Sequence, residues 1–207
     1  MNLPVSGEYL SSALCDGATV GNVKLEHRRV GDLVLPTGEL VACDPLVCPE
    51  REPFELKVPV GRFPVILSIA DLNGDQRVAF ATIRFEEAAP TAWDMMTLGG
   101  ADRSKLGPGE FFGYPVDAGT GCFMDRMAAE TLDRMMTEDS EYFWTIIHEM
   151  EETEVNTWSW ADMPFGKGNM IVFSSGFGDG VYATYVGFDE GGKVIAVVAD
   201  FAVVQLD

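Results

Sequence analysis

Basic residues and histidines are scarce in this sequence. Lysine and arginine together number 14 of the 207 residues, against 33 aspartates and glutamates, and there are two histidines, so the formal net charge at pH 7 is −19. A surface this acidic repels the phosphates of nucleic acids and anionic lipids. We therefore expect neither a nucleic acid nor a membrane as partner, and the charge favours a basic protein instead.

Long apolar runs are also missing. No stretch approaches about 18 uninterrupted apolar residues, so the sequence predicts no membrane-spanning helix. Residues 1–15 contain neither the basic segment nor the continuous apolar segment of a secretory signal. We therefore expect a cytoplasmic location.

Cysteine is sparse as well, with Cys15, Cys43, Cys48 and Cys122 as its four occurrences. This even number is compatible with two disulfides, but a chain of this size without a secretory signal more often keeps its thiols reduced. Cys43 and Cys48 lack the second pair of ligands that a structural zinc site needs, so no zinc is expected there.

The remaining composition is that of a folded protein. Apolar residues make up 47% of the chain and charged residues 23%, and the length predicts a single globular domain over residues 1–207. The 22 glycines and 11 prolines are spread along the chain, which is typical of short strands joined by turns.

Three segments are predicted to form hairpins, because in each of them two apolar or β-rich runs flank residues suited to a tight turn. They are residues 31–43 with a turn at Pro36-Thr37-Gly38, residues 63–85 with a turn at Asn73-Gly74, and residues 181–201 with a turn at Gly191-Gly192. Residues 158–165 contain two tryptophans and are interpreted as an aromatic packing segment.

Two helices are expected between these strands. Apolar residues recur near a period of 3.6 up to Met136, so one helix is predicted to end there and a second to cover residues 141–152. The predicted fold class is α+β. It comprises an antiparallel β-rich frame of hairpins, sandwich-like or half-barrel-like, with a small helical block near residues 122–152.

The first helix is preceded by a glycine-rich segment at residues 117–125 (DAGTGCFMD). Glycines admit a ligand to the backbone, and a helix start offers unpaired N–H groups, as in an anion-binding loop. Asp117 and Asp125 could instead satisfy these N–H groups internally, and Asp125 is predicted to cap the helix. The candidate ligand-binding residues of the segment are Gly119, Thr120 and Gly121.

Cys122 is expected near the N-terminus of this helix, a position that lowers the pKa of a thiol and favours the thiolate. A nucleophilic cysteine also needs a base, and His148 on the second helix is a candidate. Alternatively, Cys122 is a small apolar residue that packs beneath the loop.

A second glycine-rich segment covers residues 174–180 (SSGFGDG). Its candidate ligand-binding residues are Ser174, Ser175 and Asp179. If this segment folds over the first one, Asp117, Asp125 and Asp179 would form a carboxylate cluster suited to Mg²⁺ or Ca²⁺. The alternative is a tight strand corner in which Asp179 makes an Asx-turn.

Four segments together resemble a bacterial family called domain of unknown function 4241. They are GDLVLPTGEL at residues 31–40, VPVGRFPV at residues 58–65, and the two glycine-rich segments, in this order. The resemblance covers about residues 30–204, with Phe177 where relatives tend to have tryptophan. It implies no activity, but it implies that both glycine-rich segments belong to the identity of the fold.

Two functional hypotheses remain. The first is a non-catalytic interaction protein that binds a basic partner, as immunity proteins that neutralise toxins do. The second is a small metal-dependent hydrolase or ligand-binding enzyme that uses Asp117, Asp125 and Asp179 around Mg²⁺ or Ca²⁺, or Cys122 as a nucleophile. Only the second hypothesis requires a cofactor.

Overall fold

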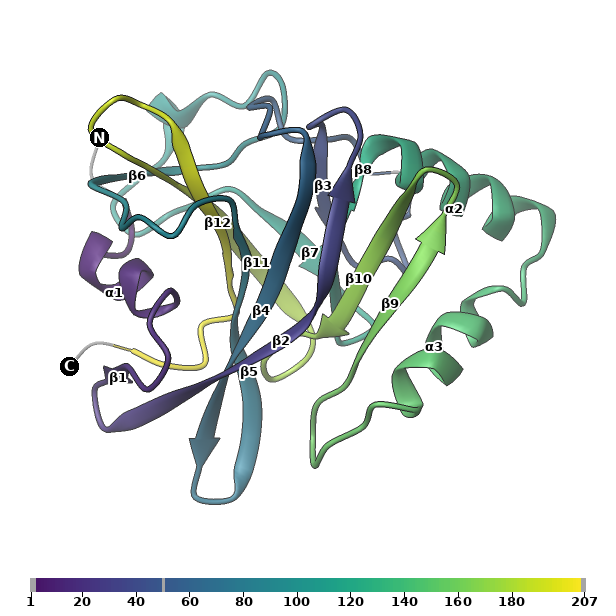
Figure 1. The fold of residues 1–207 in the computed structure, drawn as a ribbon, viewed down its shortest axis with the longest axis horizontal. Coiled ribbons are helices and arrows are strands. Elements are labelled where there is room, and N and C mark those ends of the chain that lie inside the picture. Colours follow the sequence, from purple (N-terminus) through teal and green to yellow (C-terminus); the bar gives the residue numbers. More distant parts are fainter. Residues whose placement is uncertain (1–2, 50, 206–207) are drawn as a thin grey trace.

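The computed structural model describes residues 3–49 and 51–205. Two antiparallel sheets pack face to face, with one helix on the outer side of the larger sheet and two helices on the outer side of the smaller sheet (Figure 1). The larger sheet has the order β1 (Thr19–Val20), β2 (Val23–Leu35), β4 (Gly61–Leu72), β5 (Asp75–Arg84), β12 (Val194–Asp200), β11 (Gly180–Phe188) and β6 (Ala92–Met95), and β7 (Gly113–Val116) also pairs with β11.

The smaller sheet has the order β3 (Leu40–Cys43), β8 (Thr120–Asp125), β10 (Gly168–Ser174) and β9 (Trp160–Phe165). The helices are α1 (Gly7–Ser12), the short 3₁₀ helix η1 (Arg103–Lys105), α2 (Arg126–Glu138) and α3 (Phe143–Glu151). The α+β class with an antiparallel frame and a small helical block is therefore confirmed. None of the helices in the described part of the chain has the length and apolar character needed to cross a membrane.

Two of the three expected hairpins are confirmed. Strands β4 and β5 pair around Asn73 and Gly74, whose φ angles of 62° and 95° need the residues that tolerate a left-handed backbone. Strands β11 and β12 pair in the same way, and the turn between them includes Gly192 with a φ of 79°. In both hairpins a short-range turn signal sets the pairing.

The expected hairpin at residues 31–43 is wrong. Its first run, within β2, pairs with β4 in the larger sheet, whereas its second run is β3 and pairs with β8 in the smaller sheet. Leu35 and Leu40 are both completely buried in the core between the sheets. The turn at residues 36–39 therefore carries the chain from one sheet to the other, because both runs contribute to the same core.

Strand β8 occupies residues that the sequence had suggested as a loop leading into a helix. All six of its residues are buried, because the inter-sheet core covers one face and α2 and α3 cover the other. A continuous apolar run of this kind does not distinguish a central strand from a helix start. The segment at residues 160–165 is likewise a strand, β9, at the sheet edge, where the exposed Pro164 is tolerated.

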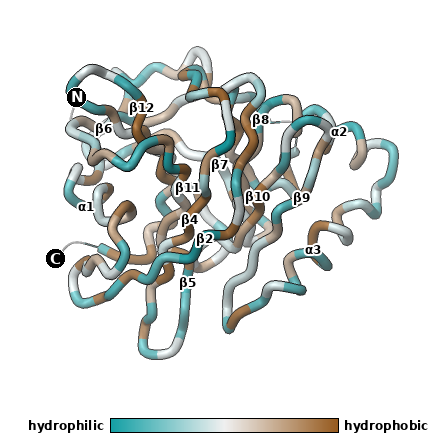
Figure 2. The backbone as a smooth tube through the Cα atoms, in the orientation of Figure 1, coloured by the Kyte–Doolittle hydropathy of each residue, from teal (hydrophilic) through white to brown (hydrophobic). Residues whose placement is uncertain are grey.

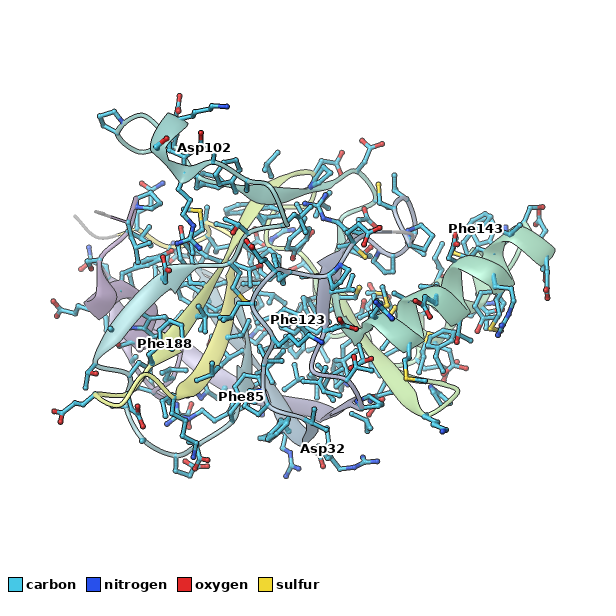
Figure 3. All side chains as sticks on the ribbon, turned by 90° about the horizontal axis from the view of Figure 1, so that it is seen from above. Asp32, Phe85, Asp102, Phe123, Phe143 and Phe188 are labelled. Carbon is cyan, nitrogen blue, oxygen red and sulfur yellow. The ribbon has the colours of Figure 1, made fainter. Side chains whose placement is uncertain are left out.

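Three apolar clusters follow from this layering. The largest fills the space between the sheets, and it includes the edge-to-face pair Phe123 and Phe173, whose ring centroids are 5.4 Å apart. A second lies between the smaller sheet and α2 and α3, and a third between the larger sheet and α1. In Figure 2 the hydrophobic stretches follow the strands, while the outer loops are mainly hydrophilic. Figure 3 shows Phe123 near the middle of the molecule and Phe143 at the edge, in the helical layer.

Asn169 joins the two sheets along β2. Its side-chain oxygen accepts a hydrogen bond from the Val34 N–H at 2.7 Å, and its amide nitrogen donates to the Asp32 carbonyl at 3.0 Å. The second half of β2 therefore lies against β10 while it stays paired with β4. This contact joins the two sheets at one side of the sandwich.

Candidate functional site

The two glycine-rich segments meet at one end of the smaller sheet. Thr120 and Ser174 lie opposite each other where β8 pairs with β10. Just beyond them, the Ser175 N–H donates to the Gly119 carbonyl at 3.0 Å. A Cβ atom added at Gly119 would lie 3.7 Å from the Cα atom of Gly178, so the two turns are in van der Waals contact.

A carboxylate that sequence reasoning missed holds the first turn. Asp44 is completely buried and accepts hydrogen bonds from the N–H groups of Asp117 at 3.0 Å and Ala118 at 2.7 Å. It also accepts from the Thr120 hydroxyl at 2.7 Å and from the Leu46 N–H at 3.1 Å. The N–H groups that could have bound an anion are therefore used inside the protein. The signal in the sequence was the Asx-turn that Asp44-Pro45 begins directly after an apolar strand.

Gly121 has a packing role. A Cβ atom at this position would lie 2.9 Å from the Tyr114 hydroxyl oxygen and 3.1 Å from the Phe173 ring. The missing side chain thus leaves room for the Tyr114 hydroxyl and the Phe173 ring between the sheets, and no ligand is needed to explain this glycine.

The second turn is also held by its own residues. The Ser175 hydroxyl donates to the Gly178 carbonyl at 3.1 Å, and the Tyr182 hydroxyl donates to the same carbonyl at 2.8 Å. Ser174 instead faces β9, where its hydroxyl oxygen accepts from the Ser159 N–H at 3.0 Å. Asp179 is exposed at this turn.

The three aspartates proposed to bind a metal do not converge. Asp125 ends β8 at the far end from Asp117, and five steps along a strand are roughly 17 Å. Among residues 3–49 and 51–205, no group of three histidine, cysteine, aspartate or glutamate side chains could hold a metal ion. The structure therefore does not bring Asp117, Asp125 and Asp179 together, because β8 separates residues that a loop would have joined.

Asp125 is the N-cap of α2, as predicted. Its carboxylate accepts from the Met127 N–H at 3.1 Å. The same carboxylate accepts from the Thr37 N–H at 2.9 Å and from the Thr37 hydroxyl at 2.9 Å. Asp125 therefore fixes both the start of the helix and the turn that carries the chain between the sheets.

Cys122 does not lie at a helix N-terminus. It is a completely buried residue in the middle of β8, and its sulfur is 3.6 Å from the sulfur of Cys43 on β3. The contact with Cys122 and, as the second cause, burial raise the pKa of the Cys43 thiol well above its usual range. His148 is exposed on α3 and stacks on Trp144, and no hydrogen bond joins it to Cys122. The packing alternative for Cys122 agrees with this geometry.

Comparison with known protein families assigns the chain. The model of the family described as Protein of unknown function (DUF4241) matches residues 33–199. The chain belongs to this family. No curated protein and no solved structure matches it. The DUF4241 region contains Asp44, both glycine-rich turns, α2 and α3, and it leaves out α1 and most of β2.

Within the DUF4241 region, residues 126–154 form a surface that we call the acidic hairpin. It comprises α2, α3 and the residues that flank α3, and it carries nine acidic and two basic residues, for a formal net charge of −7. One of the two bases, Arg126, is already paired with Glu39 at 3.3 Å and with Glu130 at 3.2 Å. Exposed glutamates that make no ion pair with any described residue are Glu138, Glu141, Glu149, Glu151, Glu152 and Glu154.

The end of α3 is electrostatically unfavourable by itself. Glu149 and Glu151 lie in its last turn and Glu152 is its C-cap, where the helix dipole opposes negative charge. Glu149 and Glu152 are also three residues apart, a spacing at which like charges on a helix repel. Trp144 lies on the same helix with 46% of its side chain exposed.

A cavity of about 310 Å³ lies at another place in the DUF4241 region. The segment around Phe54 forms part of its wall. This segment bridges the two sheets, because the Phe54 N–H donates to the Leu40 carbonyl and the Glu55 N–H donates to the Thr97 carbonyl beyond β6, both at 2.9 Å. Its walls include Arg51, Phe54, Leu98, Phe112, Tyr114 and Thr184. The cavity is thus lined mainly by apolar surface with a few polar groups, as small-molecule sites are.

Three of the residues that line the cavity have buried side-chain polar atoms without a hydrogen-bond partner in the described part of the chain. They are Arg51 Nε, the Tyr114 hydroxyl and Thr184 Oγ1, and the only further such side-chain atom in the described part of the chain is His27 Nε2. Each unpaired buried group costs about 1–3 kcal/mol of stability. Burial raises the pKa of Tyr114 well above its usual range, so its hydroxyl is protonated at neutral pH.

Proposed function

We propose that this protein is an interaction protein that binds a basic partner protein through the acidic hairpin, with Trp144 at the centre of the contact. One observation carries the proposal: an exposed tryptophan lies on the same short helix as several glutamates that have no cationic partner within the described part of the chain.

The physical reasoning has two parts. Tryptophan is among the residues that contribute most to binding when a partner covers them, and 46% exposure leaves much of the Trp144 surface available. The unpaired glutamates would steer a cationic surface toward this site, and the overall charge of −19 adds to the attraction at long range.

The repulsion at the end of α3 supports the same proposal. Carboxylates at a helix C-terminus and at a spacing of three residues destabilise the free protein. Lysine or arginine side chains of a partner would neutralise Glu149, Glu151 and Glu152 and remove this repulsion. Proteins that neutralise basic toxins in the cytoplasm are one class that would use such a surface.

The test compares two triple variants of equal net charge. One neutralises the hairpin, with Glu149→Gln, Glu151→Gln and Glu152→Gln. The other neutralises the body, with Glu55→Gln, Glu87→Gln and Glu190→Gln, all exposed in the structure. Proteins retained from a lysate of the source organism by the immobilised wild type are identified, purified and titrated against each variant by biolayer interferometry.

A basic protein should bind the wild type and the body variant equally and the hairpin variant at least about tenfold more weakly. Trp144→Ala should weaken the same complex to a similar degree. Equal losses for the hairpin and body variants would show unspecific charge attraction and contradict the proposal, as would the retention of no basic protein.

A further inference from the structure

Three features of the cavity that Phe54 lines point to a ligand-binding site. Its walls are largely apolar, a half-buried guanidinium lines it, and three of its wall residues have unpaired polar atoms. Buried polar groups are normally hydrogen-bonded. The Tyr114 hydroxyl packs against Gly121 between the sheets, whereas the other two atoms, Arg51 Nε and Thr184 Oγ1, point to a group that pairs with them when bound.

Arg51 determines the charge of the group that can bind. Its Nη2 atom donates to the Gly113 carbonyl at 3.2 Å, its Nε atom has no partner, and it makes no ion pair with any residue that the structure describes. A guanidinium offers five donors and no acceptor, so its free donors select a carboxylate or similar anion. The surrounding chain is strongly acidic, so an anion would bind here only with substantial help from apolar contacts.

We propose that this cavity binds a small organic carboxylate, whose charged head meets Arg51 and whose apolar body lies against Phe54, Leu98 and Phe112. The Thr184 hydroxyl then turns toward an oxygen atom of the ligand and pairs with it. The volume of about 310 Å³ is at the small end of the range for ligand pockets. The site is separate from the acidic hairpin, so its existence does not depend on the proposed protein partner.

The probe is 3-phenylpropionate, with 3-phenylpropanol and 3-phenylpropylamine as neutral and cationic analogues of the same body. Each is titrated into the intact protein by isothermal titration calorimetry. The carboxylate should bind at least about tenfold more tightly than the alcohol, and the amine should not bind in the cavity.

Two arginine variants separate the cavity from general charge. Arg51→Gln should remove the preference for the carboxylate over the alcohol. Arg62→Gln, a control of equal charge at an exposed position on β4, should leave the preference unchanged. Equal effects of the two variants, equal binding of acid and alcohol, or no binding of either would each overturn the proposal.

Thr184→Val provides a second test that does not depend on Arg51. It removes an unpaired buried hydroxyl while preserving shape, so it should raise the melting temperature of the ligand-free protein. It should at the same time weaken 3-phenylpropionate binding several-fold, because the ligand loses a hydrogen bond. A rise in melting temperature without any loss of affinity would contradict a role for Thr184 in the site.

Discussion

Cys43 and Cys122 lie directly opposite each other on β3 and β8, with their sulfur atoms 3.6 Å apart beneath the helical layer. Both are completely buried, whereas Cys15 is exposed on the other side of the larger sheet, near α1. The reactivity of Cys43 and Cys122 therefore measures how often the smaller sheet opens, and Cys15 serves as the surface-exposed reference thiol.

Alkylation rates should distinguish the exposed thiol from the two buried ones. With iodoacetamide at pH 8, Cys15 should react at the rate of a surface thiol, and Cys43 and Cys122 should react at least about 10³-fold more slowly, because they must wait for unfolding. Peptide mass spectrometry measures each site, and the protein in denaturant serves as the control in which all three react. Rapid modification of Cys43 in the native protein would show that β3 opens locally.

Asp44→Asn should be strongly destabilising, and Asp117→Asn should not. The Asp44 carboxylate accepts four hydrogen bonds, and an amide places an NH₂ donor against the N–H groups of residues 117 and 118. We expect a loss of about 2–4 kcal/mol in the free energy of unfolding, from urea titration. Asp117 is exposed, so its substitution should stay within about 0.5 kcal/mol. Similar losses at both positions would contradict the assignment.

Asp125→Ala should cost more than a helix cap alone. A cap contributes about 1 kcal/mol, and the two hydrogen bonds from Thr37 bring the expected loss to about 2–4 kcal/mol. Thr37→Val in a double-mutant cycle with Asp125→Ala should give a non-additive coupling energy. Asp133→Ala on the same helix is the control and should have little effect. Additive losses would mean that Thr37 and Asp125 act independently.

Ionisation of Asp200 should lower the free energy of unfolding as the pH rises from about 4 to 6. Burial raises its pKa from 3.8 to about 6, although the Ala202 N–H and the Tyr9 hydroxyl donate to it. The folded state therefore binds the proton more tightly than the unfolded state, and the stabilisation present below pH 4 is lost as the carboxyl ionises. The shift corresponds to at most about 3 kcal/mol.

Asp200→Asn removes this titration. The variant should match the wild type near pH 4 and be more stable by about 1–3 kcal/mol at pH 7.5, measured by urea titration at four pH values. Asp117→Asn provides a carboxylate control for the general effect of the acidic surface. Parallel stability curves for the wild type and Asp200→Asn would show that Asp200 ionises normally.

Local signals in the sequence predicted the local parts of this fold. Asn73 and Gly74 specified a hairpin without any help from distant residues, and Asp125 specified the start of α2. The same reasoning failed where the outcome depends on tertiary packing. Nothing near Leu40 indicates that its strand joins the other sheet, because the pattern of buried residues is the same for either partner.

The candidate site shows the same limit. Sequence reasoning left open whether the two glycine-rich segments meet, and the structure shows that they do. The same reasoning assigned the carboxylate role to Asp117 instead of Asp44, which is more than 70 residues away in the chain. Arg51, Phe112 and Thr184 come from three separate segments and carry no shared motif. Their relationship exists only in three dimensions.

The strand order also sets the sequence of events during synthesis. Strand β3 can pair only after β8 has emerged from the ribosome. Strand β5 pairs with β4 at once, but its second neighbour, β12, follows more than 100 residues later. Until residue 200 has been made, the larger sheet lacks the strand that joins β5 to β11, and pairings this distant in sequence form slowly. The nascent chain therefore exposes the edge of the apolar strand β5, and we expect chaperones that bind extended hydrophobic segments to recognise it at this stage.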